Sequence, residues 1–324
     1  QYTIVRNYKE IMIISECGVE AIPFLKTWVN FPVSMLFLYM YQRLAIRLSD
    51  RHLYQVFYIG VSFLYAILGI ILYPNRIHIG RYFGIDCIST VIVCMFYTLS
   101  TIWGSVIVSL LFWSLANRFT TASDAKRVYP ILGFIANASV ILSGCVIKYA
   151  SELSYSWNQN VIIMMSSCVF FNILNVTLHY IVENTYIPAQ TVKVKNKKHQ
   201  SKISITSAIQ NLIRNPYIRN LTIMITCYGL CMNLFEVTWK AHLNRLFVDN
   251  VEFSKFMGTV SMIKGITTMS LMLVSTTLLP RLKWFYAALV TPSIMLMLSL
   301  AFFYNTFTGS MMTIAIIGAI TNIF

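Results

Sequence analysis

The chain has 324 residues, of which 57% are hydrophobic and 11% are charged, and its mean hydropathy is +0.67. Soluble domains carry about 25% charged residues, so this composition excludes an ordinary soluble globular protein. Twenty-five Lys and Arg against eleven Asp and Glu give a formal charge of +14, which in a soluble chain would suggest nucleic-acid binding. The seven cysteines lie mostly in apolar runs without the spacing of a metal site, and we interpret them as packing residues.

Apolar runs long enough to cross a bilayer recur along the whole chain. A membrane-spanning helix needs about 20 mostly apolar residues, because its backbone polar groups must be paired within the segment. A ninth, unfinished run begins near Ser310, and the eight complete runs are residues 21–42, 55–73, 91–116, 130–150, 161–182, 217–238, 257–279 and 284–304. We therefore expect an all-α polytopic protein in a lipid bilayer. Because the sequence opens on Gln1 and stops inside an apolar run, we expect both ends to be cut.

The Lys and Arg residues of the short loops predict the orientation of the spans, since cytoplasmic loops carry the excess. One alternate set of loops holds fourteen Lys and Arg: residues 43–54, 117–129, 183–216 and 280–283. The opposite set holds five: Arg76, Arg81, Lys240, Arg245 and Lys255. Residues 1–20 are then predicted to lie outside, and the first complete span runs inward.

Residues 183–216 form the longest predicted inner loop and divide the spans into two sets. This loop contains six Lys and Arg, and no acidic residue follows Glu183 within it. A nucleic-acid site or a calmodulin target could be built from such a segment, but a solvated cytoplasmic linker that fixes the topology explains the charge more simply. We expect an N-terminal helical half over residues 1–182, a C-terminal half over residues 217–324, and no nucleic-acid partner.

Three charged side chains inside the predicted spans suggest a shared polar cavity. Lys26 lies six residues into the first span, Glu236 lies near the outer end of the sixth, and Lys264 lies eight residues into the seventh. A charge at membrane depth costs roughly 2.5–3.5 kcal/mol, so such residues usually mark function. As alternatives, Lys26 could snorkel outward, and Glu236 could pair with Lys240 at the end of their helix.

Enzyme motifs are absent from the sequence. It contains no HExxH, no Gly-rich phosphate loop and no paired carboxylates within a span, and its five His are scattered. We therefore expect no catalytic activity, no metal and no cofactor. The residues alone indicate a membrane carrier with a basic cavity, and hence an anionic solute.

Four stretches of sequence together resemble a known family. They are residues 18–28 (GVEAIPFLKTW), residues 103–117 with WGSV and LLFW, residues 125–130 (AKRVYP) and residues 233–240 (NLFEVTWK). They resemble the ATP:ADP translocases of plastids and obligate intracellular bacteria, and the likeness covers nearly the whole chain. The resemblance implies a bundle like that of the major facilitators, with twelve spans that exchange nucleotides by alternating access. This chain would supply the end of span one through part of span ten.

The resemblance also implies roles for particular residues. Lys26 matches the family's essential lysine and Glu236 its essential glutamate, whereas a second family glutamate falls on Thr101. Lys264 stands where a small uncharged residue is expected, so the cavity would be more positive than is usual in the family. We expect Lys26 and Lys264 to hold phosphates, and Glu236 either to pair with a lysine in the empty site or to take part in a gate that opens when the substrate displaces it. Trp103 or Trp28 could stack on the base, although an aromatic residue within a span is more often a packing residue. The expected substrate-binding residues are Lys26, Thr101, Trp103, Glu236, Lys240 and Lys264.

The resulting functional prediction is a transporter that exchanges ATP and ADP, or another nucleoside phosphate, across the cell membrane of an intracellular bacterium. The extra positive charge favours another nucleotide or slow, uniport-like movement over efficient ATP:ADP exchange. Thr101 and the missing ends also suit a degenerate or truncated family member without transport activity. A membrane-embedded lipid enzyme is a third class, which only the general hydropathy supports.

Overall fold

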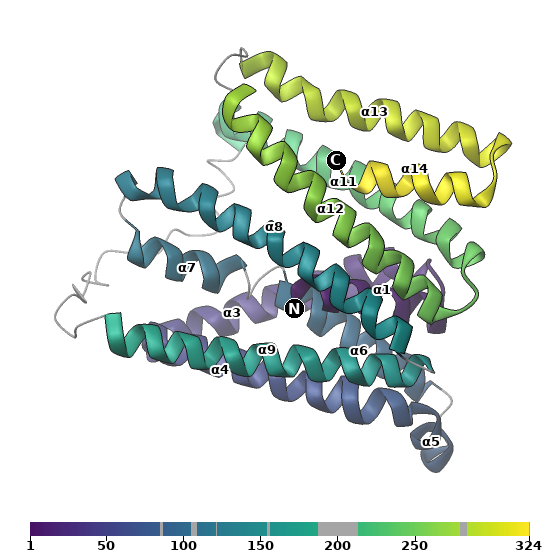
Figure 1. The fold of residues 1–324 in the computed structure, drawn as a ribbon. Coiled ribbons are helices and arrows are strands. Elements are labelled where there is room, and N and C mark those ends of the chain that lie inside the picture. The colour runs from purple at the N-terminus through teal and green to yellow at the C-terminus, as the bar shows by residue number, and fades with distance from the viewer. Residues whose placement is uncertain are drawn as a thin grey trace.

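The computed structural model describes residues 1–84, 87–104, 109–120, 122–153, 156–186, 213–278 and 284–323, and these form helices joined by short loops, with no strand among them (Figure 1). This confirms the all-α prediction. The N-terminal helices are α1 (Tyr2–Cys17), α2 (Ala21–Phe24), η1 (Leu25–Asn30), α3 (Phe31–Arg47), α4 (Asp50–Tyr65), η2 (Ala66–Leu72), α5 (Tyr73–Phe83), α6 (Ile88–Ile102), α7 (Ser109–Phe119), α8 (Ala122–Leu153) and α9 (Trp157–Tyr186). The C-terminal helices are α11 (Pro216–Leu246), α12 (Asn250–Leu278), α13 (Trp284–Thr308) and α14 (Met311–Ile323).

Seven helices of the described chain have the length and apolar composition of membrane spans: Ala21–Arg47, Arg51–Phe83, Val128–Leu153, Trp157–Val182, Pro216–Leu246, Asn250–Val274 and Leu289–Thr308. Two shorter apolar helices, Ile88–Ile102 and Met311–Asn322, also fall on predicted runs. The predicted run 91–116 is covered by α6 and α7, and residues 105–108 between them lie outside the described residues. Most of the predicted linker, residues 187–212, lies outside them too, so the division into two halves stays a prediction.

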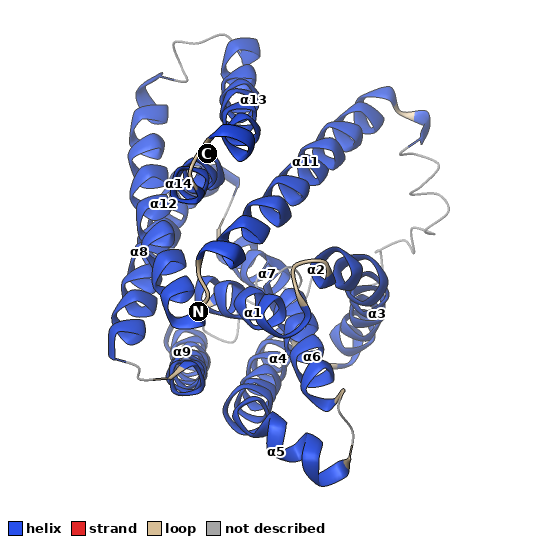
Figure 2. Cartoon of the chain, turned by 90° about the vertical axis from the view of Figure 1, so that its right-hand side faces the viewer, coloured by secondary structure: helices blue, strands red, loops and turns tan. Residues whose placement is uncertain are grey.

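Helix α1 was not among the predicted apolar runs, because residues 1–20 were assigned to the outer side. Tyr2–Cys17 is a helix whose middle is buried, and it lies between α6 and α12 and packs against both (Figure 2). A hydropathy scan misses this helix because its four charged residues lower the mean hydropathy of the segment. Each of these charged side chains nevertheless has a polar partner inside the bundle. Arg76 and Lys240, counted among the outer-loop cations, are likewise buried within helices.

Two of the spans widen into π-helical turns shortly before a proline. The turn Leu25–Asn30 precedes Pro32, and the turn Ala66–Leu72 precedes Pro74. Proline has no N–H to donate, and its ring clashes with the carbonyl group four residues earlier, so the helical hydrogen bonds must change register there. Such turns are frequent at functional sites. The first of them contains Lys26.

Helices α8 and α12 approach each other through glycines. A Cβ atom on Gly144 would lie 2.7 Å from the carbonyl oxygen of Gly258, and a Cβ on Gly258 would lie 3.1 Å from that of Gly144. Small residues let the backbones of membrane helices approach this closely. Because α8 precedes the predicted linker and α12 follows it, this contact joins the N-terminal helices to the C-terminal ones.

Candidate functional site

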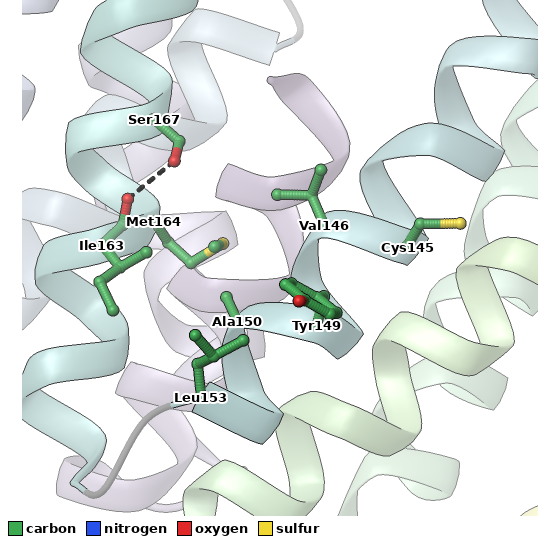
Figure 3. Close-up of a pocket in the computed structure, with 8 residues that line it drawn as sticks. All are labelled: Cys145, Val146, Tyr149, Ala150, Leu153, Ile163, Met164 and Ser167. Atoms are coloured by element: carbon green, nitrogen blue, oxygen red, sulfur yellow. Dashed lines mark hydrogen bonds between the residues drawn. The ribbon is translucent and has the colours of Figure 1, made fainter.

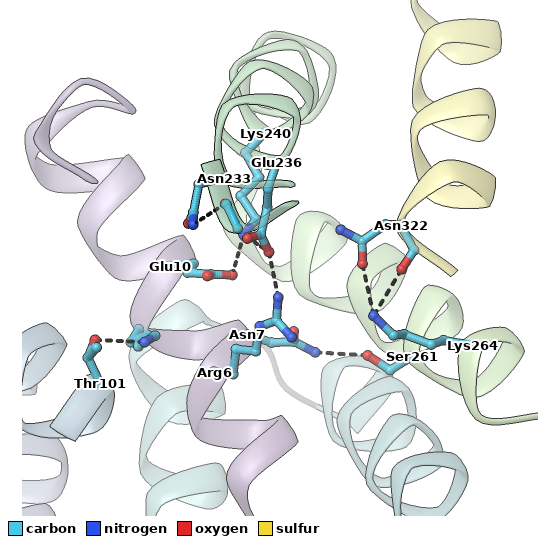
Figure 4. Close-up of polar contacts among 12 residues, drawn as sticks. Arg6, Asn7, Glu10, Thr101, Asn233, Glu236, Lys240, Ser261, Lys264 and Asn322 are labelled. Atoms are coloured by element: carbon cyan, nitrogen blue, oxygen red, sulfur yellow. Dashed lines mark hydrogen bonds and ion pairs between the residues drawn. The ribbon is translucent and has the colours of Figure 1, made fainter. Parts of the chain in front are cut away.

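A chain of four charged side chains links α1 to α11 (Figure 4). Arg6 Nη2 and Lys240 Nζ each lie 2.7 Å from Glu236 Oε1. Lys240 Nζ also lies 2.6 Å from Glu10 Oε2. The charges therefore alternate in sign along the chain, and Glu236 serves two cations from two different helices.

Helical spacing explains why these four residues meet. Arg6 and Glu10 are four residues apart on α1, and Glu236 and Lys240 are four residues apart on α11, so each pair occupies one face of its helix. The two faces meet with opposite charges in register. Glu10 and Lys240 are only 5% and 2% exposed. Leaving a charge unpaired at this depth is costly, so these ion pairs favour the placement of α1 beside α11.

Three further ammonium groups near this chain are held by neutral oxygen atoms. Lys9 Nζ lies 2.7 Å from Thr101 Oγ1, and Lys26 Nζ lies 2.6 Å from Asn233 Oδ1. Lys264 Nζ lies 2.9 Å from the carbonyl oxygen of Asn322 and 3.3 Å from its Oδ1. Within the described residues, no carboxylate lies within ion-pair distance of any of these three lysines.

This group of seven charged side chains, the cationic cluster, is suited to an anion. It consists of Arg6, Lys9, Glu10, Lys26, Glu236, Lys240 and Lys264, and its five cations against two carboxylates leave a formal charge of +3. Amide, hydroxyl and carbonyl oxygens bind an ammonium group less strongly than an anionic oxygen does. At Lys9, Lys26 and Lys264, an incoming anion could therefore replace these neutral oxygens without breaking an ion pair.

The structure brings several predicted residues together. Lys26 contacts Asn233, which lies one helical turn before Glu236 on α11. Lys264 lies on α12 and contacts α14, and one turn before it Ser261 accepts a 3.1 Å hydrogen bond from Asn7 of α1 (Figure 4). Glu10 and Glu236 lie within electrostatic range of both Lys26 and Lys264. Helix α1 is therefore the element around which the predicted residues gather.

The two tryptophans considered for base stacking have opposite environments. Trp103 is fully buried and packs edge-on against Tyr58, with 4.7 Å between the ring centroids. Its indole offers no open face to a base in this conformation. Trp28 is 71% exposed, two residues beyond Lys26. Base stacking by either residue stays a prediction.

Sequence reasoning missed Arg6, Lys9 and Glu10 because it assigned residues 1–20 to the outer side. A signal was present: these charges recur three and four residues apart, as residues on one side of a helix do, and an apolar run from Ile11 to Ile14 follows them. A second, partly buried contact on the same helix, Glu16 Oε1 with Arg76 Nε at 2.7 Å, fixes the end of α1 against α5. Arg76 also donates to the Tyr73 carbonyl oxygen of its own helix, which indicates a structural role.

The hollow between α8 and α9 is a different kind of site (Figure 3). Its volume is about 510 Å³, and apolar side chains such as Tyr149, Leu153, Ile163 and Met164 line it. No charged residue lines this hollow. The cationic cluster is therefore the better candidate for binding a polar solute. Elsewhere in the described ranges, no group of three His, Cys, Asp or Glu residues could hold a metal ion.

The fold and the cluster together define a polytopic all-α membrane protein with a cationic site between its helices. Comparison with known proteins then specifies the family. The family model described as TLC ATP/ADP transporter matches residues 1–323, and the chain belongs to that family. The resemblance seen in the sequence is thereby confirmed. No solved structure matches the chain.

Related proteins come from plants and from intracellular bacteria. The chain is 36% identical over 326 residues to "ADP,ATP carrier protein 1, chloroplastic" of Arabidopsis thaliana, covering 93% of this chain and 52% of that protein. It is 32% identical over 334 residues to "ADP,ATP carrier protein 1" of Chlamydia muridarum, covering 93% and 63%. It is 28% identical over 333 residues to "ADP,ATP carrier protein 3" of Rickettsia conorii, covering 92% and 66%. The chain spans about half the length of the plant relatives.

Proposed function

We propose that the protein carries nucleotides across a membrane by alternating access, exchanging ATP and ADP or another pair of nucleoside phosphates. The observation that carries this proposal is the set of three lysines held by neutral oxygens beside the ion-paired chain of α1 and α11. A nucleoside polyphosphate brings about three to four negative charges, and fixed cations must replace the hydration that it gives up. The printed names of the relatives, ADP,ATP carriers, support the same solute.

The contacts suggest how the proposed binding residues act. Lys26 and Lys264 would exchange their neutral partners for phosphate oxygens. Glu236 cannot contact phosphate favourably, so its role is to neutralise Arg6 and Lys240 while the site is empty. A phosphate that enters the cluster competes with Glu236 for Arg6, which weakens the contact between α1 and α11. Substrate binding is then coupled to the separation of these helices.

The two-half organisation belongs to this proposal. Residues 1–182 and 217–324 would form the two helical halves, with residues 183–216 as the linker between them. The contacts of α1 with α11 and α12 would then lie at the interface between the halves, where secondary transporters bind their substrates. The intact transporter would contain further spans beyond those of this chain, arranged like the major facilitators.

We further propose that the protein is not an enzyme and that it works in the cell membrane of an intracellular bacterium. The relatives from Chlamydia and Rickettsia support this location. The chloroplastic relatives make a plastid membrane the competing location. Fractionation of the source cells, followed by immunodetection of the protein, decides between the two.

Uptake of labelled nucleotides into cells that express the intact protein tests the proposed transport. We expect uptake that saturates and that an excess of unlabelled nucleotide suppresses. Lys148→Gln is a matched control, because Lys148 also lies in a predicted span but its side chain makes no hydrogen bond or ion pair with the described residues. Lys26→Gln should abolish uptake, whereas Lys148→Gln should preserve it. Correct membrane insertion without uptake of any nucleotide would instead support the non-transporting alternative.

A further inference from the structure

Lys9 is a buried cation with no carboxylate within ion-pair distance among the residues that the structure describes. It is 7% exposed, and its ammonium group donates a 2.7 Å hydrogen bond to the Thr101 hydroxyl oxygen. The face of the Tyr97 ring lies 4.9 Å from the same nitrogen. The Thr101 hydroxyl in turn donates to the Tyr97 carbonyl oxygen at 2.8 Å, so its oxygen is oriented to accept from Lys9. Both partners of this ammonium group are neutral.

The two carboxylates of the cationic cluster already form ion pairs with other cations. Glu10 directs its Oε2 to Lys240, and Glu236 is shared by Lys240 and Arg6. Burying an ammonium group without a carboxylate is costly, and proteins maintain such an arrangement mainly where the charge has a function. Lys9 therefore differs from Arg6 and Lys240, whose charges the protein neutralises internally.

Lys9 also lies within reach of the rest of the cationic cluster. It is within electrostatic range of Glu10, and also of the cations Arg6, Lys26 and Lys240. Arg6 lies three residues before Lys9 on α1, so the two side chains occupy neighbouring positions on one side of the helix. The Arg6 side chain is 36% exposed. An anion that reaches Arg6 thus has Lys9 among the cations close by on the same helix.

We propose that Lys9 is the residue that senses how many phosphate charges a nucleotide carries, and that Thr101 keeps it available by holding it without neutralising it. This inference rests on the proposed function and names the specificity-determining residue of the same site. The phosphate chain of a triphosphate or diphosphate extends past Arg6 to Lys9, whereas a monophosphate reaches Arg6 but not Lys9. Affinity then increases from AMP to ADP to ATP because of Lys9.

The test measures the equilibrium binding of ATP, ADP and AMP to the purified intact protein by calorimetry. Lys9→Gln should weaken ATP binding about 10- to 150-fold, the effect of losing one charged partner, and should weaken AMP binding much less. Thr101→Glu should act in the same direction, because a carboxylate at position 101 would neutralise Lys9 from within. Thr101→Gln, of equal size but without charge, should weaken ATP binding far less than Thr101→Glu.

Two further variants keep the test independent of folding defects. Lys9→Arg retains the charge and should retain the preference for ATP over AMP. In the Lys9→Gln background, Thr101→Glu should cause little further loss of discrimination, because the cation that it neutralises is absent. Equal losses for ATP and AMP in Lys9→Gln, or an unchanged ATP affinity in Thr101→Glu, would overturn the role of Lys9. A parent protein that binds no nucleotide would overturn the proposed function itself.

Discussion

Glu236 allows the cationic cluster to respond to an incoming anion. Its carboxylate neutralises two cations, Arg6 of α1 and Lys240 of its own helix. Lys240 has a second carboxylate in Glu10, but Arg6 has no other carboxylate partner within the described chain. When phosphate takes Arg6, Lys240 therefore stays neutralised. The cluster can accept an anion without leaving a buried charge unpaired, which would otherwise cost several kcal/mol.

Replacing Lys26 by Ala should weaken nucleotide binding and leave membrane insertion normal. The loss of one charged phosphate contact is expected to cost about 1.5–3 kcal/mol, roughly a 10- to 150-fold decrease in affinity. Binding of labelled nucleotide to the purified variant measures this effect. Near-normal affinity would show that Lys26 only extends toward the membrane surface and holds Asn233.

The charge excess of the cluster should slow turnover. Thr101→Glu combined with Lys264→Thr lowers the formal charge near α1 by two, and both changes act on one electrostatic potential. The double variant should exchange ATP for ADP faster than the parent and faster than either single variant, because product release is eased. Exchange rates of the four proteins in liposomes provide the comparison. A parent protein that exchanges as fast as the double variant would refute the idea.

At the level of elements, the sequence predicted the long apolar helices well and α1 poorly. Hydropathy finds helices such as α8 and α9 because each contains a long stretch of high mean hydropathy. Helix α1 was missed because its charges are satisfied by partners that are far away in the sequence, such as Glu236 and Thr101. The positions of Lys26 and Glu236 inside predicted spans were sufficient to mark both as candidate site residues. The neutral partners Asn233 and Asn322 carry no such signal, since in-span amides are also common between packed helices.

The orientation of the spans is open to a direct test by thiol labelling. Single cysteines at Gln200, in the predicted linker, and at Val248, between α11 and α12, are placed in a protein lacking the native cysteines. Val248 is 95% exposed, so a cysteine there is accessible to reagents. The Lys and Arg distribution predicts that an impermeant reagent labels position 248 in intact cells and position 200 only after lysis. Preferential labelling at 200 in intact cells would reverse the topology.

At the scale of the whole molecule, one end of the bundle is locked by polar contacts between the N-terminal and C-terminal helices. Tyr8 donates to Asn160 at 2.7 Å and accepts from Ser254 at 3.1 Å. Ser151 accepts from Asn160 at 3.2 Å and donates to Ser254 at 3.3 Å, which closes a ring across α1, α8, α9 and α12. By the predicted topology this ring lies toward the outer side, so the proposed outward release of a substrate would require it to open.

A covalent link across this end should therefore stop transport. Glu152 and Lys255 form a 3.1 Å ion pair between α8 and α12, and their side chains are nearly half exposed. Cysteines at both positions, joined by a short bifunctional thiol reagent, should reduce nucleotide uptake to background, and cleavage of the link should restore it. The two single-cysteine variants treated in the same way serve as controls. Undiminished uptake by the linked protein would mean that these ends need not separate.

The proposed movement of nucleoside phosphates across the membrane by the cationic cluster around α1 can be measured directly. Labelled ATP, ADP, GTP and UTP are offered to nucleotide-loaded liposomes that contain the purified intact protein, and the Lys26→Ala variant is measured in parallel. We predict saturable entry of at least one of these nucleotides with the parent and entry at background level with the variant. Absence of entry for all four, or equal entry with and without Lys26, would contradict the claim.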